Sequence, residues 1–181
     1  LMLEYDCLYL GDNARAPYGT RSFEVINQYT YEAVEYLFSK NCPLIILACN
    51  TSSAKALRNI QQTVLPKKFP DKKVLGVIRP TTEEIGNYSK SGYIGIMGTA
   101  GTVVSNSYPI EIAKFFPNVH VVQQSCPMWV PLVENNSFNE EGGQYYIQKY
   151  IAELLEKEPR IDTIVLACTH YPLLKLSLIH I

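Results

Sequence analysis

The sequence predicts an α/β fold built on mainly parallel sheets. Short apolar runs rich in β-branched residues alternate with longer segments whose apolar residues recur at helical spacing. This alternation is typical of βαβ units, in which helices cover a parallel sheet. The chain has 181 residues, of which 47% are hydrophobic, so it can bury the core of one ordinary domain or of two small ones.

Six apolar runs have the length and composition expected of strands. They are Asp6–Leu10, Leu44–Ala48, Val74–Val77, Tyr93–Met97, His120–Gln124 and Thr163–Ala167. Parallel strands need a crossover connection, so helices are expected between them.

The first helix is expected to begin near Phe23 and to end near Lys40, because its apolar residues fall on one stripe. The sequence predicts four further helices at Ser53–Thr63, Thr81–Tyr88, Thr102–Phe116 and Glu140–Glu158.

Two segments interrupt this pattern. Pro66–Lys73 is rich in Pro and Lys and is predicted to be a surface loop. Gly76–Pro80 is predicted to close a strand and to form a hinge, because proline restricts the residue before it. We therefore expect a domain boundary near Pro80, with a first α/β domain over 1–79 and a second over 80–181. Leu176–Ile181 is too short a continuation to bury a helix face, so we expect the chain to be cut there, with its last residues foreign to the native gene.

Composition narrows the classes of function. The chain has 16 basic and 17 acidic residues, so it lacks the basic surplus that direct nucleic-acid binding requires. No apolar stretch reaches about 18 residues and no signal peptide precedes the first strand, so we expect a soluble, cytoplasmic protein without membrane contact. Neither C-x-x-C nor H-x-x-x-H occurs, and no glycine-rich nucleotide motif is present. The sequence therefore predicts neither a metal nor a cofactor.

Cys49 and Cys168 occupy similar positions in two similar segments. Each follows an apolar strand ending in Ala and precedes small polar residues that can open a helix. Ligands of open α/β sheets bind outside the carboxyl ends of strands, so both thiols are candidates for chemistry. A helix N-terminus would lower the pKa of each thiol. The alternative is that each is an inert buried cysteine, which is the interpretation we favour for Cys7, Cys42 and Cys126.

Other residues could complete such a site. Tyr18 and Gly19 end a loop, Gly11–Gly19, that can present hydroxyl and backbone N–H groups to a carboxylate, although an ordinary turn has the same composition. Thr99 and Thr102 begin a helix and could bind an anion, or could simply cap it.

His170 and Glu134 are candidates for tuning the second thiol. His170 follows Cys168 by two residues and could orient or deprotonate it, or could only hydrogen-bond the backbone. Glu134 could supply a carboxylate to the same thiol, or could be a solvated helix residue.

Three blocks together resemble bacterial glutamate racemases. They are Gly11–Gly19, Ala48-Cys49-Asn50-Thr51 and Ala167-Cys168-Thr169-His170-Tyr171-Pro172-Leu173-Leu174. The resemblance implies two doubly wound, mainly parallel α/β domains with the active site in the cleft between them, one cysteine from each domain, no PLP and no metal. The sequence also departs from that family in three ways. No Asp-Ser pair with a glycine-rich turn precedes Gly11, and the helices that complete the first domain are missing. Arg79 stands where the family has a Glu in the hinge. The first domain is thus expected to lack its first strand and its C-terminal helices, and we expect weak or absent activity.

The resemblance also assigns roles. Cys49 and Cys168 become the proton donor and acceptor, with Glu134 beside the second thiol. The expected substrate contacts are Tyr18, Gly19, Asn50, Thr51, Thr169 and His170. D-glutamate would serve peptidoglycan synthesis and cell shape, and the expected partners are glutamate, a second copy of the chain and DNA gyrase. Two alternatives remain open: a related racemase for aspartate or hydantoin, and a fragment that serves only as a binding module.

Overall fold

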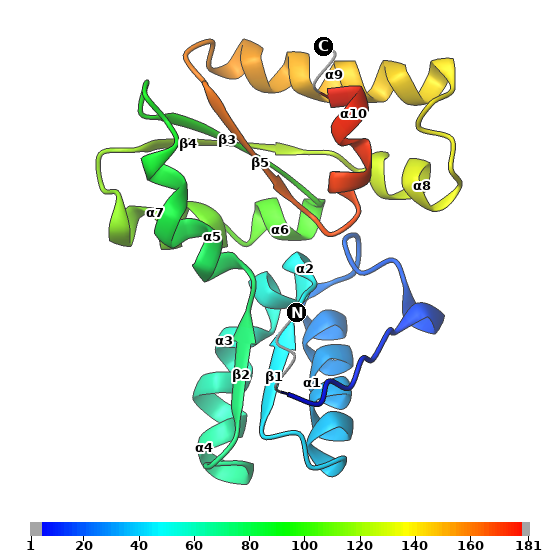
Figure 1. Ribbon diagram of the computed structural model, residues 1–181, viewed down its shortest axis with the longest axis vertical. Helices are drawn as coiled ribbons and strands as arrows, with labels where there is room; N and C mark the ends of the chain where they lie inside the picture. Colours follow the sequence, from blue (N-terminus) through cyan, green and yellow to red (C-terminus); the bar gives the residue numbers. More distant parts are fainter. Residues whose placement is uncertain (1–4, 179–181) are drawn as a thin grey trace.

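The computed structural model of the protein describes residues 5–178. Its strands are β1 (Leu44–Leu47), β2 (Lys73–Gly76), β3 (Tyr93–Gly98), β4 (His120–Ser125) and β5 (Thr163–Ala167). They form two separate parallel sheets, one with the order β1-β2 and one with the order β4-β3-β5 (Figure 1). The predicted α/β class with parallel sheets is confirmed.

Helices connect these strands. The α-helices are α1 (Phe23–Ser39), α2 (Asn50–Lys55), α3 (Leu57–Asn59), α4 (Leu65–Lys68), α5 (Ile78–Glu84), α6 (Ala100–Val104), α7 (Ser107–Phe115), α8 (Trp129–Glu134), α9 (Glu141–Lys157) and α10 (Lys175–Leu178). The 3₁₀-helices are η1 (Asn13–Arg15), η3 (Ile85–Asn87) and η4 (Tyr171–Leu174), and η2 (Ile60–Val64) is a π-helix.

We call the β1-β2 sheet with α1 to α4 the small lobe. Its buried core consists of Val34, Phe38, Ile45, Ala56, Ile60 and Val74. Ile45 and Val74 are register partners, so they place one face of the sheet against the helices. On the opposite face, Leu44, Ile46 and Leu75 are 46%, 56% and 48% exposed. This sheet is therefore covered on one side only within the described residues, which corrects the expectation that it is doubly wound.

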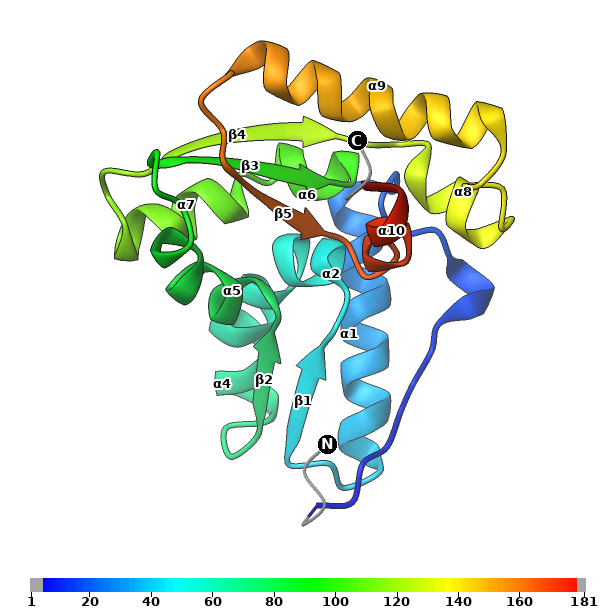
Figure 2. The same cartoon turned by 45° about the horizontal axis from the view of Figure 1, so that its top comes forward.

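We call the β4-β3-β5 sheet with α5 to α10 the large lobe, and helices cover both of its faces (Figure 2). Ile94, Ile96 and Val165 belong to a core cluster shared with α5 and α7. Met97, on the other face, packs with α8 and α9 in a second cluster. Both faces are apolar, as expected of a parallel sheet buried on both sides.

One predicted strand is wrong. Asp6–Leu10 has no strand structure and runs exposed along the small lobe, with Tyr9 89% exposed. A strand is stabilised by a paired neighbour, and within the described residues Asp6–Leu10 pairs with neither edge of the β1-β2 sheet.

The predicted helix boundaries need three corrections. The helix expected over 53–63 begins at Asn50 and is broken into α2, α3 and η2. The helix expected over 102–116 is broken at Asn106, whose φ of 53° is left-handed and ends the helical path between α6 and α7. The loop expected over 66–73 begins instead with α4, where Pro66 stands in the first turn and is tolerated.

Other expectations about elements are confirmed. α1 and α9 match the predicted helices closely. A further boundary differs from the prediction: the helix expected over 81–88 begins at Ile78 as α5, so Pro80 lies in its first turn and the segment after β2 becomes helical at once. The division into domains at residues 79 and 80 stays a prediction. So does the foreign origin of Leu176–Ile181, of which 179–181 lie outside the described residues.

Candidate functional site

The two candidate cysteines lie where the lobes meet. Cys49 follows β1 and directly precedes α2, and Cys168 follows β5. β1 and β5 direct their carboxyl ends toward the junction from opposite sides (Figure 1). A negative charge on Cys49 raises the pKa of Cys168, so the two thiols are close enough to influence each other.

Two polar contacts join residues on either side of this junction. Thr51 Oγ1 lies 3.0 Å from Thr99 Oγ1, and both residues are buried. Gly101 N–H donates to the carbonyl of Gly19 at 3.0 Å. The residues after Cys49 and the loop before α1 are thus fixed against the start of α6.

His170 stands between Cys168 and Glu134. Its Nδ1 lies 3.8 Å from Cys168 Sγ, and its Nε2 is hydrogen-bonded to Glu134 Oε1. The histidine therefore has both a thiol and a carboxylate as partners, and it does not only bond the backbone. Glu134 is the last residue of α8, so the carboxylate comes from a different element than the thiol.

Burial dominates the acidity of Cys168. It raises the pKa of the thiol to about 11, although the backbone N–H groups of His170 and Tyr171 and the Thr169 hydroxyl lower it. The sequence predicted that local donors would lower the pKa of this thiol. This prediction is wrong, because the pKa is raised overall. Desolvation disfavours the thiolate more than the three donors stabilise it.

Tyr18 lies near Cys49 and is held by two residues that the sequence did not single out. Its hydroxyl donates to Asp12, and Arg15 forms a 2.7 Å ion pair with the same carboxylate. Arg15 also pairs with Glu32 of α1. Burial, and then the hydrogen bond to Asp12, raise the pKa of Tyr18, and a charge on Cys49 adds to this rise. The opposite charges of Asp12 and Arg15, three residues apart in the sequence, could have indicated that these side chains pair and hold Tyr18.

The remaining predicted residues differ in accessibility. Thr99 caps α6, because its Oγ1 accepts from Thr102 N at 3.3 Å, and Thr102 is fully buried. Thr169 is exposed, and its Oγ1 lies 3.5 Å from His170 Nδ1. The other three cysteines are free thiols outside this group, with Cys7 exposed and Cys126 buried.

Several known proteins that are similar to this chain in sequence or fold are glutamate racemases. A glutamate racemase of Geobacter metallireducens is 41% identical over 170 residues, which cover 94% of this chain and 60% of that protein. One of Streptococcus thermophilus is 39% identical over 168 residues, covering 93% of this chain and 59% of that protein. The chain is a homologue of the glutamate racemases. No protein-family model matches it.

Solved glutamate racemases also share the fold. Isoform RacE1 from Bacillus anthracis gives a TM-score of 0.83 at 33% identity, covering 93% of this chain and 60% of that one. The enzyme from Francisella tularensis, solved in complex with D-glutamate, gives 0.81 at 28% identity, covering 94% of this chain and 61% of that one. The chain thus spans about 60% of the length of the glutamate racemases it matches.

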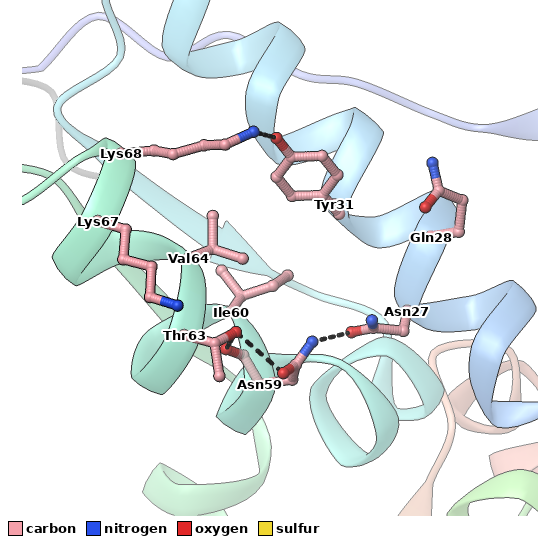
Figure 3. A pocket seen from close by; sticks show the side chains of 9 residues that line it. All are labelled: Asn27, Gln28, Tyr31, Asn59, Ile60, Thr63, Val64, Lys67 and Lys68. Carbon is pink, nitrogen blue, oxygen red and sulfur yellow. Dashed lines mark hydrogen bonds between the residues drawn. The ribbon is translucent and has the colours of Figure 1, made fainter.

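A surface groove of about 240 Å³ lies apart from the residues matched to glutamate racemase motifs (Figure 3). It runs between α1 and the η2–α4 segment. Two pairs of its polar groups bond to each other: Lys68 Nζ donates to the Tyr31 hydroxyl at 2.6 Å, and Asn59 Nδ2 donates to Asn27 Oδ1 at 3.0 Å. None of the candidate site residues lines it.

Among residues 5–178, no group of three His, Cys, Asp or Glu side chains could hold a metal ion. Across the same part of the chain, no helix is both long and apolar enough to cross a membrane.

Proposed function

We propose that this chain interconverts L- and D-glutamate without a cofactor, with Cys49 and Cys168 as the acid/base pair. One observation carries the proposal: Cys49 after β1 and Cys168 after β5 lie near enough for a charge on Cys49 to raise the pKa of Cys168, and Cys168 lies next to His170, which is hydrogen-bonded to Glu134. The similarity to glutamate racemases over 94% of the chain supports glutamate as the substrate.

The reaction requires two groups on opposite faces of the substrate. A base removes the Cα proton on one face, and an acid returns a proton on the other. For the D isomer, Cys49 thiolate takes the proton and the Cys168 thiol donates its own. For the L isomer the roles are exchanged. Each turnover leaves one proton on the pair, so charge and protons balance.

The electrostatics of the pair suit this demand. Each thiolate raises the cost of ionising the other, which favours the state with one thiolate and one thiol. Burial keeps the proton on Cys168 in the resting state. For the L isomer Cys168 must lose that proton and Cys49 must carry one. His170, oriented by Glu134, is placed to accept the proton of Cys168 and pass it to solvent, while Cys49 takes up a proton from solvent, so the pair still holds one proton.

Surrounding donors would hold the substrate and its carbanion-like transition state. Asn50, Thr51, Thr99 and Thr169 are proposed for this role, together with Tyr18 and Gly19 from the loop that ends beside Thr99. Thr102 supports Thr99 from behind. Preorganised donors stabilise developing charge more effectively than water, because they need not reorient during the reaction.

We infer a role in supplying D-glutamate for peptidoglycan, and a second copy of the chain and DNA gyrase as partners. These inferences rest on the family resemblance, and sedimentation analysis and pull-down with purified gyrase test them. A related racemase for aspartate or hydantoin is the alternative function.

The deciding experiment is Cα proton exchange in D₂O. The chain is incubated with L-glutamate, D-glutamate or L-aspartate without added cofactor, and NMR follows the loss of the Cα proton while chiral chromatography follows the product. Exchange of both glutamate isomers with formation of the opposite isomer supports the proposal. Exchange of aspartate alone favours the alternative, and no exchange of any amino acid would leave only a binding module.

A further inference from the structure

The Tyr108 side chain connects the core of the large lobe to the residue after Cys49. Its hydroxyl donates a buried 2.7 Å hydrogen bond to Asn50 Oδ1. The ring is 2% exposed and packs in the core cluster that contains Ile94, Ile96 and Ile112. The hydroxyl is therefore held rigidly, and the Asn50 amide takes its orientation from it.

This bond determines which end of the Asn50 amide is free. An asparagine side chain has one acceptor oxygen and one NH₂ donor, and Tyr108 occupies the oxygen. Among the described residues no acceptor is hydrogen-bonded to Asn50 Nδ2, and this atom is not one of the fully buried unpaired polar atoms. The NH₂ group can therefore donate to a bound molecule, and a carboxylate is the acceptor that suits it best.

Tyr108 also remains a donor while the thiols change charge. Burial, and to a smaller extent a charge on Cys168, raise the pKa of the Tyr108 hydroxyl. The Tyr108 hydroxyl thus keeps its proton when Cys168 becomes a thiolate. It continues to donate to Asn50 Oδ1, so the Asn50 side-chain amide keeps the same orientation during turnover.

We propose that Tyr108 is a positioning residue that keeps the Asn50 NH₂ group directed to a substrate carboxylate beside Cys49. This inference rests on the proposed function and goes beyond it, because Tyr108 itself touches neither reacting atoms nor substrate. It acts from the opposite lobe through one hydrogen bond.

A double-mutant cycle tests the coupling. In Tyr108→Phe, KM for both glutamate isomers is expected to rise about fivefold to tenfold, the scale of one hydrogen bond, with kcat changed less than about twofold. In an Asn50→Ala background, Tyr108→Phe is expected to have no further effect on KM. An equal rise in both backgrounds would mean a general structural role and would overturn the proposal. Tyr150→Phe, which removes the hydroxyl of another buried tyrosine in the same lobe, is the control and is expected to leave KM unchanged.

A second variant keeps the test decisive if Tyr108→Phe does not fold. Asn50→Asp keeps an acceptor for Tyr108 but replaces the NH₂ donor with a negative charge. It is expected to lose most glutamate binding while its thermal unfolding midpoint stays near that of the parent. Glutamate affinity equal to that of the parent chain would overturn the proposal.

An NMR measurement separates this inference from the proposed function. In the ¹⁵N-labelled chain, the Asn50 side-chain NH₂ signal, identified by its loss in Asn50→Ala, is expected to shift and to exchange faster in Tyr108→Phe but not in Tyr150→Phe. An unmoved signal would overturn the positioning role whether or not the chain is active. A parent chain that neither binds nor exchanges glutamate would instead contradict the proposed function.

Discussion

His170 Nδ1 lies 3.8 Å from the Sγ of Cys168, in the turn that follows β5. The other ring nitrogen is hydrogen-bonded to Glu134 at the end of α8. The imidazole can therefore accept the proton of a thiol whose pKa burial has raised, while the carboxylate stabilises the imidazolium that forms.

Cys49→Ala and Cys168→Ala should each abolish racemisation. Each variant lacks the acid or base on one face, so turnover should fall by about 10³-fold or more. Chiral chromatography after incubation with each isomer measures the loss. Cys7→Ala and Cys42→Ala are matched controls, because both thiols lie outside the site, and they should retain the parent rate. Normal turnover in either of the first two variants would rule out the two-thiol assignment.

His170→Asn should reduce the rate of exchange by about 10²-fold, since it removes a proton acceptor next to Cys168. Glu134→Gln should cost roughly tenfold, the scale of one charge-assisted hydrogen bond. The double variant should lose little more than His170→Asn alone, because Glu134 acts through the histidine. Multiplicative losses in the double variant would show that the two residues act independently.

The value of kcat/KM should not fall as the pH rises through the neutral range. The pair must carry one proton in total, and that proton stays on Cys168 until the pH approaches its pKa of about 11. The rates for both isomers should therefore not decline below about pH 10, and they should follow the same profile because the equilibrium constant is one. Rates measured in D₂O and H₂O buffers from pH 6 to 10.5 test this. A decline between pH 7 and 9 would contradict the raised pKa.

Gly19→Ala should weaken glutamate binding. A Cβ at Gly19 would lie 2.7 Å from Cβ and Cγ2 of Thr99, so the loop or the threonine must move. The shift also strains the hydrogen bond from Gly101 N–H to the Gly19 carbonyl. KM is expected to rise more than tenfold, as measured by exchange kinetics. Gly142→Ala is the control, because nothing lies within 4 Å of a Cβ at that position.

The open face of the β1-β2 sheet should promote self-association. Leu44, Ile46 and Leu75 form an exposed apolar row on strands whose edges are also unpaired within the described residues. Ile46→Lys should reduce binding of a hydrophobic dye and reduce concentration-dependent association in sedimentation experiments, with little change in stability. Ile45→Val, on the buried face, should instead lower the unfolding free energy by about 0.5–1.5 kcal/mol without changing association. Unchanged association in Ile46→Lys would exclude this face as its cause.

The local pattern of the chain was sufficient for most of the fold. The apolar stripe of α1 and the β-branched runs of β1 to β5 are short-range signals, and they were predicted correctly because each element buries the face that its own period defines. Asp6–Leu10 has the same composition as a strand but remains unpaired, because pairing depends on a neighbour that the segment itself does not specify. Asn106 and Ala56 break helices whose apolar periodicity continues through them.

By itself, the sequence determined the α/β class and the similarity to glutamate racemases, and it singled out Cys49 and Cys168 as candidates, because strand composition and short motifs are local properties. Only the tertiary structure decided that Glu134 is hydrogen-bonded to His170 and that Tyr108 is hydrogen-bonded to Asn50 across the lobes. It also decided that Asp12 and Arg15 hold the loop of Tyr18, and that burial raises the pKa of Cys168. The physical reason is that hydrogen bonds between distant segments and the burial of a thiol depend on how the lobes pack. The local donors around Cys168 predicted the opposite direction of its pKa, since sequence shows the donors but not the desolvation.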